Sequence, residues 1–187
     1  MPYPFSQEIL FAEGRQKTLA KLAESTDNVR DKEFPSRLPQ MGAPDLDGFA
    51  RGPLKKYTWQ TLPSSDTLVV DKEGFHWFVE FKNQPANNIE GQEIHGKVFG
   101  SLLLANLTCS QCMTLRELMS KSIFVVVFPH RDYSTMLGKA LAQDAYGPKA
   151  VLWGLDKLVK AEMLHDAHTV TDLEFRQLGP FKGEEQP

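Results

Sequence analysis

The pattern of hydrophobic and polar positions divides the first third of the chain into three segments. Residues 6–24 place apolar side chains at helical spacing among charged ones, which predicts an amphipathic helix. Residues 25–53 carry several prolines and glycines and are interpreted as a loop. A first strand is expected near residues 54–61, where the sequence reads LKKYTWQT.

The clearest element predicted from the pattern is a β-hairpin. DTLVVD (66–71) and FHWFVEFKN (75–83) are rich in branched and aromatic residues, which favour strands. Between them, DKEG (71–74) has the composition of a turn, with Gly74 able to adopt a positive φ. Two such runs joined by a short glycine-containing turn predict a hairpin.

The segments after the hairpin predict a helix and a buried strand. The helix is expected over about 89–107, followed by a further helical piece, SQCMTLRELMSK. The residues expected on one face of the helix are Ile94, Val98, Leu102 and Leu103. The continuous apolar run SIFVVVF (122–128) is typical of a strand that is buried on both faces.

The last third of the chain is interpreted as mainly helical. A helix is expected near 132–144, then a mixed segment at 149–164 and a short C-terminal helix. Thr171 and Glu174 have the spacing of a capping box at the start of that last helix.

The order of elements predicts an α/β fold with a mixed central sheet of four to five strands flanked by helices. A chain of 187 residues suits a single domain, 1–187, with a core at about 6–128 and a helical addition at 129–187. No apolar run reaches the roughly 18–20 residues that cross a bilayer, and the first residues lack the pattern of a signal peptide. A cytoplasmic location without a membrane partner is therefore expected.

Charge and cysteine content limit the function classes. The net charge of −3 is unusual for a dedicated nucleic-acid binder, but an enzyme can hold nucleic acid through a local patch and bound cations. Cys109 and Cys112 form a lone CxxC, which needs two more ligands for tetrahedral zinc. His95 and His130 are conceivable partners, yet two reduced thiols are the preferred interpretation.

The candidate chemistry lies in the hairpin. Side chains alternate along a strand, so Glu80 and Lys82 point to the same face, and both need partners in an otherwise apolar strand. Asp66 opens the partner strand and is expected to reach the same point. Two carboxylates, with the carbonyl of Phe81, would suit Mg²⁺ or Mn²⁺, and Lys82 would orient water or stabilise charge on a phosphate. A structural ion pair between Glu80 and Lys82 is the alternative.

The arrangement Asp66-x13-Glu80-x-Lys82, set as strand, turn and strand, resembles the PD-(D/E)xK nuclease superfamily, although Ser65 stands where the pattern has proline. The resemblance implies a restriction-endonuclease-like core of a helix, three strands, a helix and a fourth strand. It also implies Mg²⁺-dependent hydrolysis of phosphodiester bonds, DNA ahead of RNA as partner, and a homodimer as one possible assembly. The strings VEFKNQ, GSLLLAN and FVVVFPH also resemble small bacterial proteins with an EFKN signature.

The resemblance also suggests supporting residues around this triad. Superfamily members often carry a metal-supporting glutamate on the first helix, and their helix after the motif often faces the scissile phosphate. The candidates are Glu13 and Glu24 on the first helix, Gln84 after the second strand of the hairpin, and Lys97, with Ser101 one turn further, on the next helix. For each candidate, a solvated helix face or a turn is the competing interpretation.

Several alternatives stay open at this point. Asp45 and Asp47 in GAPDLDG form a second acidic cluster that could supply the metal aspartate instead of Asp66. His165 and His168 are interpreted as surface or capping residues. The main functional hypothesis is a metal-dependent DNA nuclease. The others are a binding or regulatory module that does not cut, and a phosphodiesterase acting on RNA or a small molecule.

Overall fold

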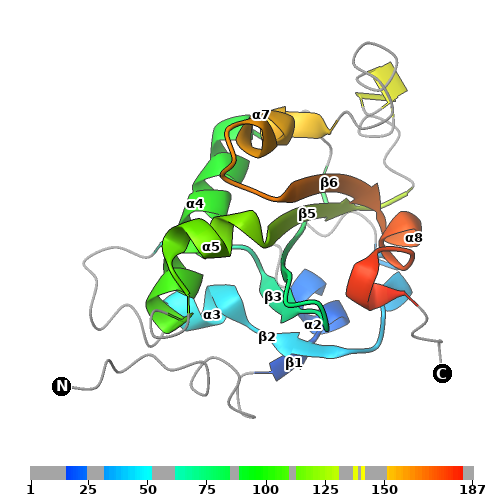
Figure 1. Ribbon diagram of the computed structural model, residues 1–187. Coiled ribbons are helices and arrows are strands. Elements are labelled where there is room, and N and C mark those ends of the chain that lie inside the picture. Colours follow the sequence, from blue (N-terminus) through cyan, green and yellow to red (C-terminus); the bar gives the residue numbers. More distant parts are fainter. Residues whose placement is uncertain are drawn as a thin grey trace.

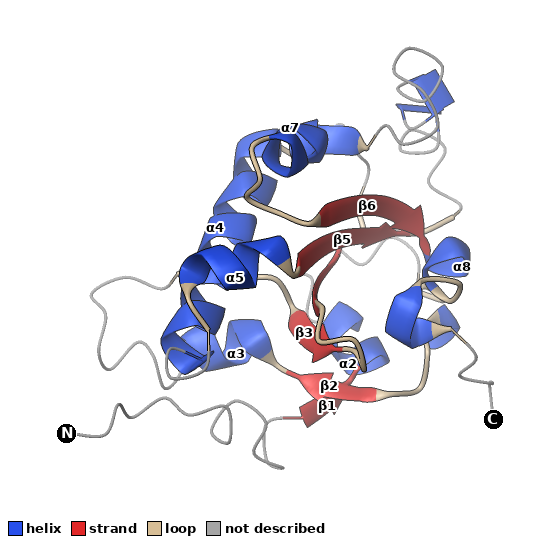
Figure 2. Cartoon of the chain, in the orientation of Figure 1, coloured by secondary structure: helices blue, strands red, loops and turns tan. Residues whose placement is uncertain are grey.

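The computed structural model describes residues 16–24, 32–51, 62–84, 89–109, 113–130, 137–138, 140–141 and 151–182 of the chain. The predicted α/β class is confirmed: a mixed four-stranded sheet, a separate two-stranded sheet and several helices are present (Figure 2).

The central sheet has the strand order β3 (Thr67–Val70), β4 (His76–Phe81), β5 (Ser122–Phe128) and β6 (Asp166–Thr171). β3 and β4 are antiparallel and form the predicted hairpin, whereas β4, β5 and β6 are parallel. In the hairpin turn, Gly74 has a φ of 82°, and Asp71 Oδ1 accepts hydrogen bonds from the backbone of Glu73 and Phe75. The carboxyl ends of the three parallel strands therefore lie along one edge of the sheet.

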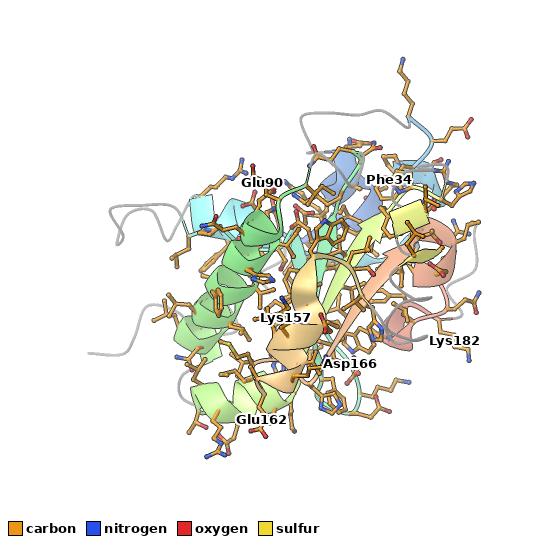
Figure 3. All side chains as sticks on the ribbon, turned by 90° about the horizontal axis from the view of Figure 1, so that it is seen from above. Phe34, Glu90, Lys157, Glu162, Asp166 and Lys182 are labelled. Atoms are coloured by element: carbon orange, nitrogen blue, oxygen red, sulfur yellow. The ribbon has the colours of Figure 1, made fainter. Side chains whose placement is uncertain are left out.

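Helices cover both faces of this sheet (Figure 1). The face with Phe78, Phe124 and Val126 packs against α3 (Leu46–Arg51), α4 (Gly91–Cys109), α5 (Leu115–Ser120) and α7 (Leu155–Lys160). The opposite face packs against α2 (Leu19–Glu24), η2 (Pro35–Arg37), α8 (Asp172–Phe175) and η6 (Gly179–Phe181). In the view from above, Lys157 on α7 lies on the α4 side, and Phe34 and Lys182 lie on the other side (Figure 3).

Two expectations for the first 53 residues are wrong in the described part. Gln16–Thr18, expected to be helical, form β1, and only Leu19–Glu24 are helical. The expected loop 25–53 contains η2, α3 and β2 (Gly42–Pro44), which pairs with β1. The hydrophobic pattern did not predict these elements because they are short, and runs of three to six residues show no clear hydrophobic period.

The helix predicted after the hairpin is confirmed as α4, and the piece that follows contains α5, which begins with a capping box from Thr114. Ile94, Val98 and Leu102 are buried, as expected. Leu103, however, is exposed, and Leu104 is buried in its place. The apolar sequence GSLLLAN allows either position to face the sheet, so periodicity alone did not separate the two leucines.

The C-terminal region is not a purely helical addition. The 3-10 turn η5 (Leu152–Gly154) and α7 lead into β6, which joins the central sheet beside β5. The predicted capping box at Thr171 and Glu174 is confirmed at the start of α8. Because β6 is part of the sheet, residues beyond 128 contribute to the core of the domain.

Some predicted elements lie outside the described residues. These are residues 6–15, the strand near 54–61 and most of the helix near 132–144. Among the helices that are described, none combines the length and the hydropathy needed to cross a bilayer.

Candidate functional site

The β3–β4 hairpin brings Asp66 and Glu80 together, as the sequence predicted. The antiparallel register pairs Thr67 with Val79, so Asp66 directly before β3 lies opposite Glu80 on β4. Asp66 Oδ2 accepts a hydrogen bond of 2.7 Å from the backbone N–H of Phe81. This bond fixes the aspartate carboxylate to the strand that carries Glu80.

Glu80 is surrounded by two lysines that arrive from different elements. Its Oε1 atom lies 3.0 Å from Nζ of Lys82, at the end of its own strand, and 2.6 Å from Nζ of Lys97 on α4. Lys82 Nζ is also 2.5 Å from Oε1 of Glu93, one turn before Lys97 on α4. The predicted triad and Lys97 therefore form one cluster in the structure.

Glu93 is the member of this cluster that sequence reasoning missed. It lies eleven residues after Lys82 and on a different element, so strand alternation gives no hint of the contact. The available signal was its spacing of four residues from Lys97, which places both side chains on the same side of α4.

Asp66, Glu80 and Lys82 are buried, whereas Glu93 is exposed at the rim of the cluster, and burial changes the electrostatics of the site. The exposed fractions are 6% for Asp66, 1% for Glu80 and 6% for Lys82. Burial, and then the neighbouring charge of Glu80, raise the pKa of Asp66 well above its usual value; Lys97 and the Phe81 N–H offset only part of this. Burial acts to lower the pKa of Lys97, but the charges of Glu80 and Asp66 outweigh it, so that pKa is raised.

One oxygen of the cluster has no partner among the described residues. Glu80 Oε2 is buried and makes no hydrogen bond within that part of the chain, whereas both lysine contacts of this carboxylate are with Oε1. A buried charged oxygen without a donor is costly, and such atoms are rare in folded proteins. The raised pKa of Asp66 shows that its negative charge is poorly compensated. Together with the unsatisfied oxygen of Glu80, it indicates that the site could accept further positive charge.

The loop before Asp66 is held against α4 by a close backbone approach. A Cβ atom on Gly100 would overlap the carbonyl oxygen of Pro63, so only glycine allows the loop to lie there. One residue further on α4, Ser101 Oγ accepts from the backbone N–H of Ser65 at 2.8 Å and donates to Ser65 Oγ at 3.1 Å. These contacts position Asp66, and the Ser101 side chain binds the loop.

Of the other supporting candidates, the two that the structure describes, Glu24 and Gln84, are not seen to join the cluster. Glu13 lies outside the described residues. Glu24 is exposed at the end of α2 and pairs with Lys21 at 3.2 Å, which matches the solvated-helix interpretation. Gln84 is partly buried three residues beyond the end of β4, past the strand face that it was expected to extend. The role of the Phe81 carbonyl stays a prediction.

The second acidic cluster is divided between two roles. Asp45 Oδ1 accepts from the N–H of Gly48 in the first turn of α3, and Oδ2 pairs with Lys17 at 2.5 Å. Asp47 pairs with Arg51 at 2.9 Å, but its charge also acts on Asp66 and Lys97. The aspartate that meets Glu80 is therefore Asp66, and Asp47 adds negative charge beside it.

Three further histidines and the two cysteines do not join the Glu80 cluster in the part of the chain that is described. His165 is exposed and packs on Phe75, and His168 stacks on Trp77. His95 Nε2 lies 2.8 Å from the carbonyl oxygen of Trp153, away from the CxxC. Cys109 ends α4, and Cys112 lies outside the described residues.

A second buried charge cluster is centred on Asp172, which is fully buried at the start of α8. Its Oδ1 atom accepts from the backbone N–H of His130 at 2.8 Å and lies 3.1 Å from His130 Nδ1. Its Oδ2 atom accepts from Nε of Arg37. Arg176 in turn donates from its guanidinium to the carbonyl of Arg37. Both Asp172 oxygens are thus satisfied by protein donors.

Comparisons with known proteins assign no family and no function to this site. No family model matches the sequence, and neither a curated protein nor a solved structure is significantly similar to it. Within the part of the chain that is described, no three side chains of His, Cys, Asp or Glu are grouped so that they could bind a metal ion. The cluster offers a pair of carboxylates, Asp66 and Glu80, rather than a complete set of side-chain ligands.

Proposed function

We propose that this protein is a Mg²⁺- or Mn²⁺-dependent nuclease of the PD-(D/E)xK type, acting in the cytoplasm on phosphodiester bonds, with DNA ahead of RNA as substrate. The observation that carries the proposal is the unpartnered, buried Oε2 atom of Glu80 beside Asp66, whose pKa is raised. Two adjacent carboxylates, one with an unsatisfied buried oxygen and the other with a raised pKa, are suited to a hard divalent cation.

The residues divide the proposed work between them. Asp66 and Glu80 would hold the ion, with the carbonyl of Phe81 as a third protein ligand. The bound ion would supply Lewis acidity at a phosphate oxygen and lower the pKa of a bound water. Lys82, held 3.0 Å from Glu80 and 2.5 Å from Glu93, would orient the attacking water or stabilise charge on the phosphate. Glu93 fixes the position of that lysine ammonium.

Metal binding is the first test of this proposal. Titration calorimetry with Mn²⁺ is expected to show binding to the wild-type protein, and no binding to Glu80→Gln, which keeps the shape of the side chain. Asp156→Asn is the matched control, because Asp156 forms only an exposed ion pair with Lys160. Wild-type protein that does not bind Mn²⁺ would exclude the metal-dependent mechanism.

Cleavage is the second test. Supercoiled plasmid, linear duplex and single-stranded DNA are incubated with Mn²⁺ and either wild-type protein or Lys82→Met. Cutting is expected to fall about 100-fold or more in Lys82→Met, since removal of one preorganised charge at an oxyanion costs that much. Lys160→Met serves as control, and unchanged cutting by Lys82→Met would remove this lysine from the mechanism. Sedimentation of the DNA complex would show whether the protein binds DNA as a homodimer.

A module that binds without cutting is the second candidate function, and one observation favours it. Both lysines of the cluster are already paired with carboxylates, Lys82 with two of them, so the metal-free site has little free positive charge for a phosphate. Binding of DNA without cleavage, at any Mn²⁺ concentration that saturates the protein, would decide for this alternative.

A further inference from the structure

The ion pair between Lys97 and Glu80 differs from the one that Lys82 makes. Lys97 Nζ is 2.6 Å from Glu80 Oε1, closer than Lys82 Nζ at 3.0 Å. Asp66 and Asp47 also act on its charge, so the ammonium of Lys97 lies in the field of three carboxylates. It is the main positive charge that offsets Asp66 in the metal-free protein.

The two lysines are anchored to different degrees. Lys82 is shared between Glu80 and Glu93, and its side chain is only 8% exposed. Lys97, by contrast, has Glu80 as its one ion-pair partner in the described part of the chain, and its side chain is 18% exposed. A lysine has four flexible methylene groups, so Lys97 can swing its ammonium into solvent without repacking the core. Lys82 lacks that freedom.

We propose that Lys97 is a built-in counter-ion that holds the place of the divalent cation, and that the cation binds by exchanging with the Lys97 ammonium at Glu80. This inference rests on the metal site of the proposed function and adds a step that regulates its loading. A divalent cation coordinated by the Glu80 carboxylate at about 2.1 Å would repel the ammonium that lies 2.6 Å from Oε1 and share the same negative charge with it, which favours release of Lys97. Oε2 of Glu80, buried without a partner, is the atom to which the incoming ion would bind first.

The test is the affinity for Mn²⁺ alone, measured by titration calorimetry at pH 8. Lys97→Gln removes the competing charge and is expected to bind Mn²⁺ about tenfold more tightly than wild type. Lys97→Arg keeps the charge and is expected to gain no affinity. Lys160→Gln removes a lysine from an exposed ion pair with Asp156, so its affinity is expected to stay unchanged.

Thermal unfolding supplies a readout that does not depend on cleavage. Without metal, Lys97→Gln is expected to unfold at a lower temperature than wild type, because Asp66 and Glu80 lose a counter-ion. Mn²⁺ is expected to raise its unfolding temperature by more than it raises that of wild type. If Lys97→Gln is unfolded without metal, Mn²⁺ is expected to refold it, and failure to refold would overturn the exchange.

The outcomes separate this inference from the proposed function. If wild type binds Mn²⁺ and Lys97→Gln binds equally or less tightly, the exchange is wrong and the metal site stands. If neither protein binds, both are wrong. If only Lys97→Gln binds, the exchange is supported, and the wild-type chain is a blocked site rather than a metal-dependent nuclease.

Discussion

The two buried charge clusters differ in one respect, the balance between carboxylates and donors. At Asp172, one carboxylate receives hydrogen bonds from Arg37 and from the backbone of His130, and both oxygens are satisfied. At Glu80, one oxygen pairs with both Lys82 and Lys97, and the other, also buried, has no partner among the described residues.

This difference separates a structural role from a functional one. The Asp172 cluster joins residues that are far apart in sequence, at the end of β5, the start of α8 and η2, and needs nothing more. A cluster with an unsatisfied oxygen carries an energetic cost that folding alone does not explain. Incomplete satisfaction of buried charge, rather than burial of charge as such, is what points to Asp66 and Glu80 as the working site.

Removal of Asp172 is expected to have the largest effect on stability. Asp172→Ala leaves the guanidinium of Arg37, whose side chain is only 15% exposed, without its buried partner. A broken pair of this kind costs about 3–5 kcal/mol of unfolding free energy, measured by urea denaturation. Asp172→Asn, which keeps one acceptor, is expected to lose less. If either folded variant lost Mn²⁺ affinity while the Glu80 cluster stayed intact, the division of roles would be wrong.

Gly100→Ala is expected to affect both stability and the site. The added methyl group would overlap the Pro63 carbonyl, so the loop before Asp66 must move, at about 1–3 kcal/mol of unfolding free energy. Mn²⁺ affinity should fall with it, since that loop positions the carboxylate. Gly138→Ala is the matched control, because no atom of the described residues lies within 4 Å of the added group there. Equal stability of the two variants would contradict the close approach.

Asp66→Asn is expected to stabilise the metal-free protein at neutral pH. Because the pKa of Asp66 is raised in the folded state, the neutral, protonated form of this side chain is the one that favours folding, and its contribution is complete only below the usual pKa. That stability is lost as pH rises from the usual value of 3.8 toward the raised one. In urea titrations with a chelator from pH 4 to 8, wild type should decline relative to Asp66→Asn. If the unfolding free energies of the two proteins changed in parallel with pH, the burial of a charged Asp66 would not be unfavourable, and this prediction would be wrong.

The smallest effect is expected at Glu24. Its ion pair with Lys21 is exposed on both sides, and such pairs contribute about 0.5 kcal/mol or less. Glu24→Gln should therefore leave unfolding free energy and Mn²⁺ affinity nearly unchanged in urea titration and calorimetry. A clear loss of Mn²⁺ affinity would return Glu24 to the metal site.

The predictable part of the site was its local part. Alternation along β4 places Glu80 and Lys82 on one face, and the short turn at Gly74 sets the hairpin register that brings Asp66 opposite Glu80. The shared face and the hairpin register both involve residues close in sequence, so regular strand geometry is enough to predict them. Lys97 was found through a resemblance rather than through geometry.

The unpredicted part depends on contacts between elements. Glu93 reaches Lys82, and Gly100 lets the loop at Pro63 lie on α4, only because α4 docks on that face of the sheet. The hydrophobic periodicity of the sequence does not predict how α4 packs on the sheet. β6 was missed for a related reason: as an outer strand of the described sheet it carries Asp166 and His168 among its residues, so its hydrophobic signal is weak.

The placement of Glu80 and Lys97 on separate elements has a consequence for how the chain folds. A hairpin with a short turn, such as β3–β4, forms in microseconds, whereas the parallel pairing of β4 with β5 must wait for the crossover through α4 and α5. Asp66 and Glu80 therefore approach each other before the ammonium of Lys97 arrives to separate their charges. If the metal site is as proposed, divalent ions present at that stage would offset the repulsion between the two carboxylates and accelerate folding.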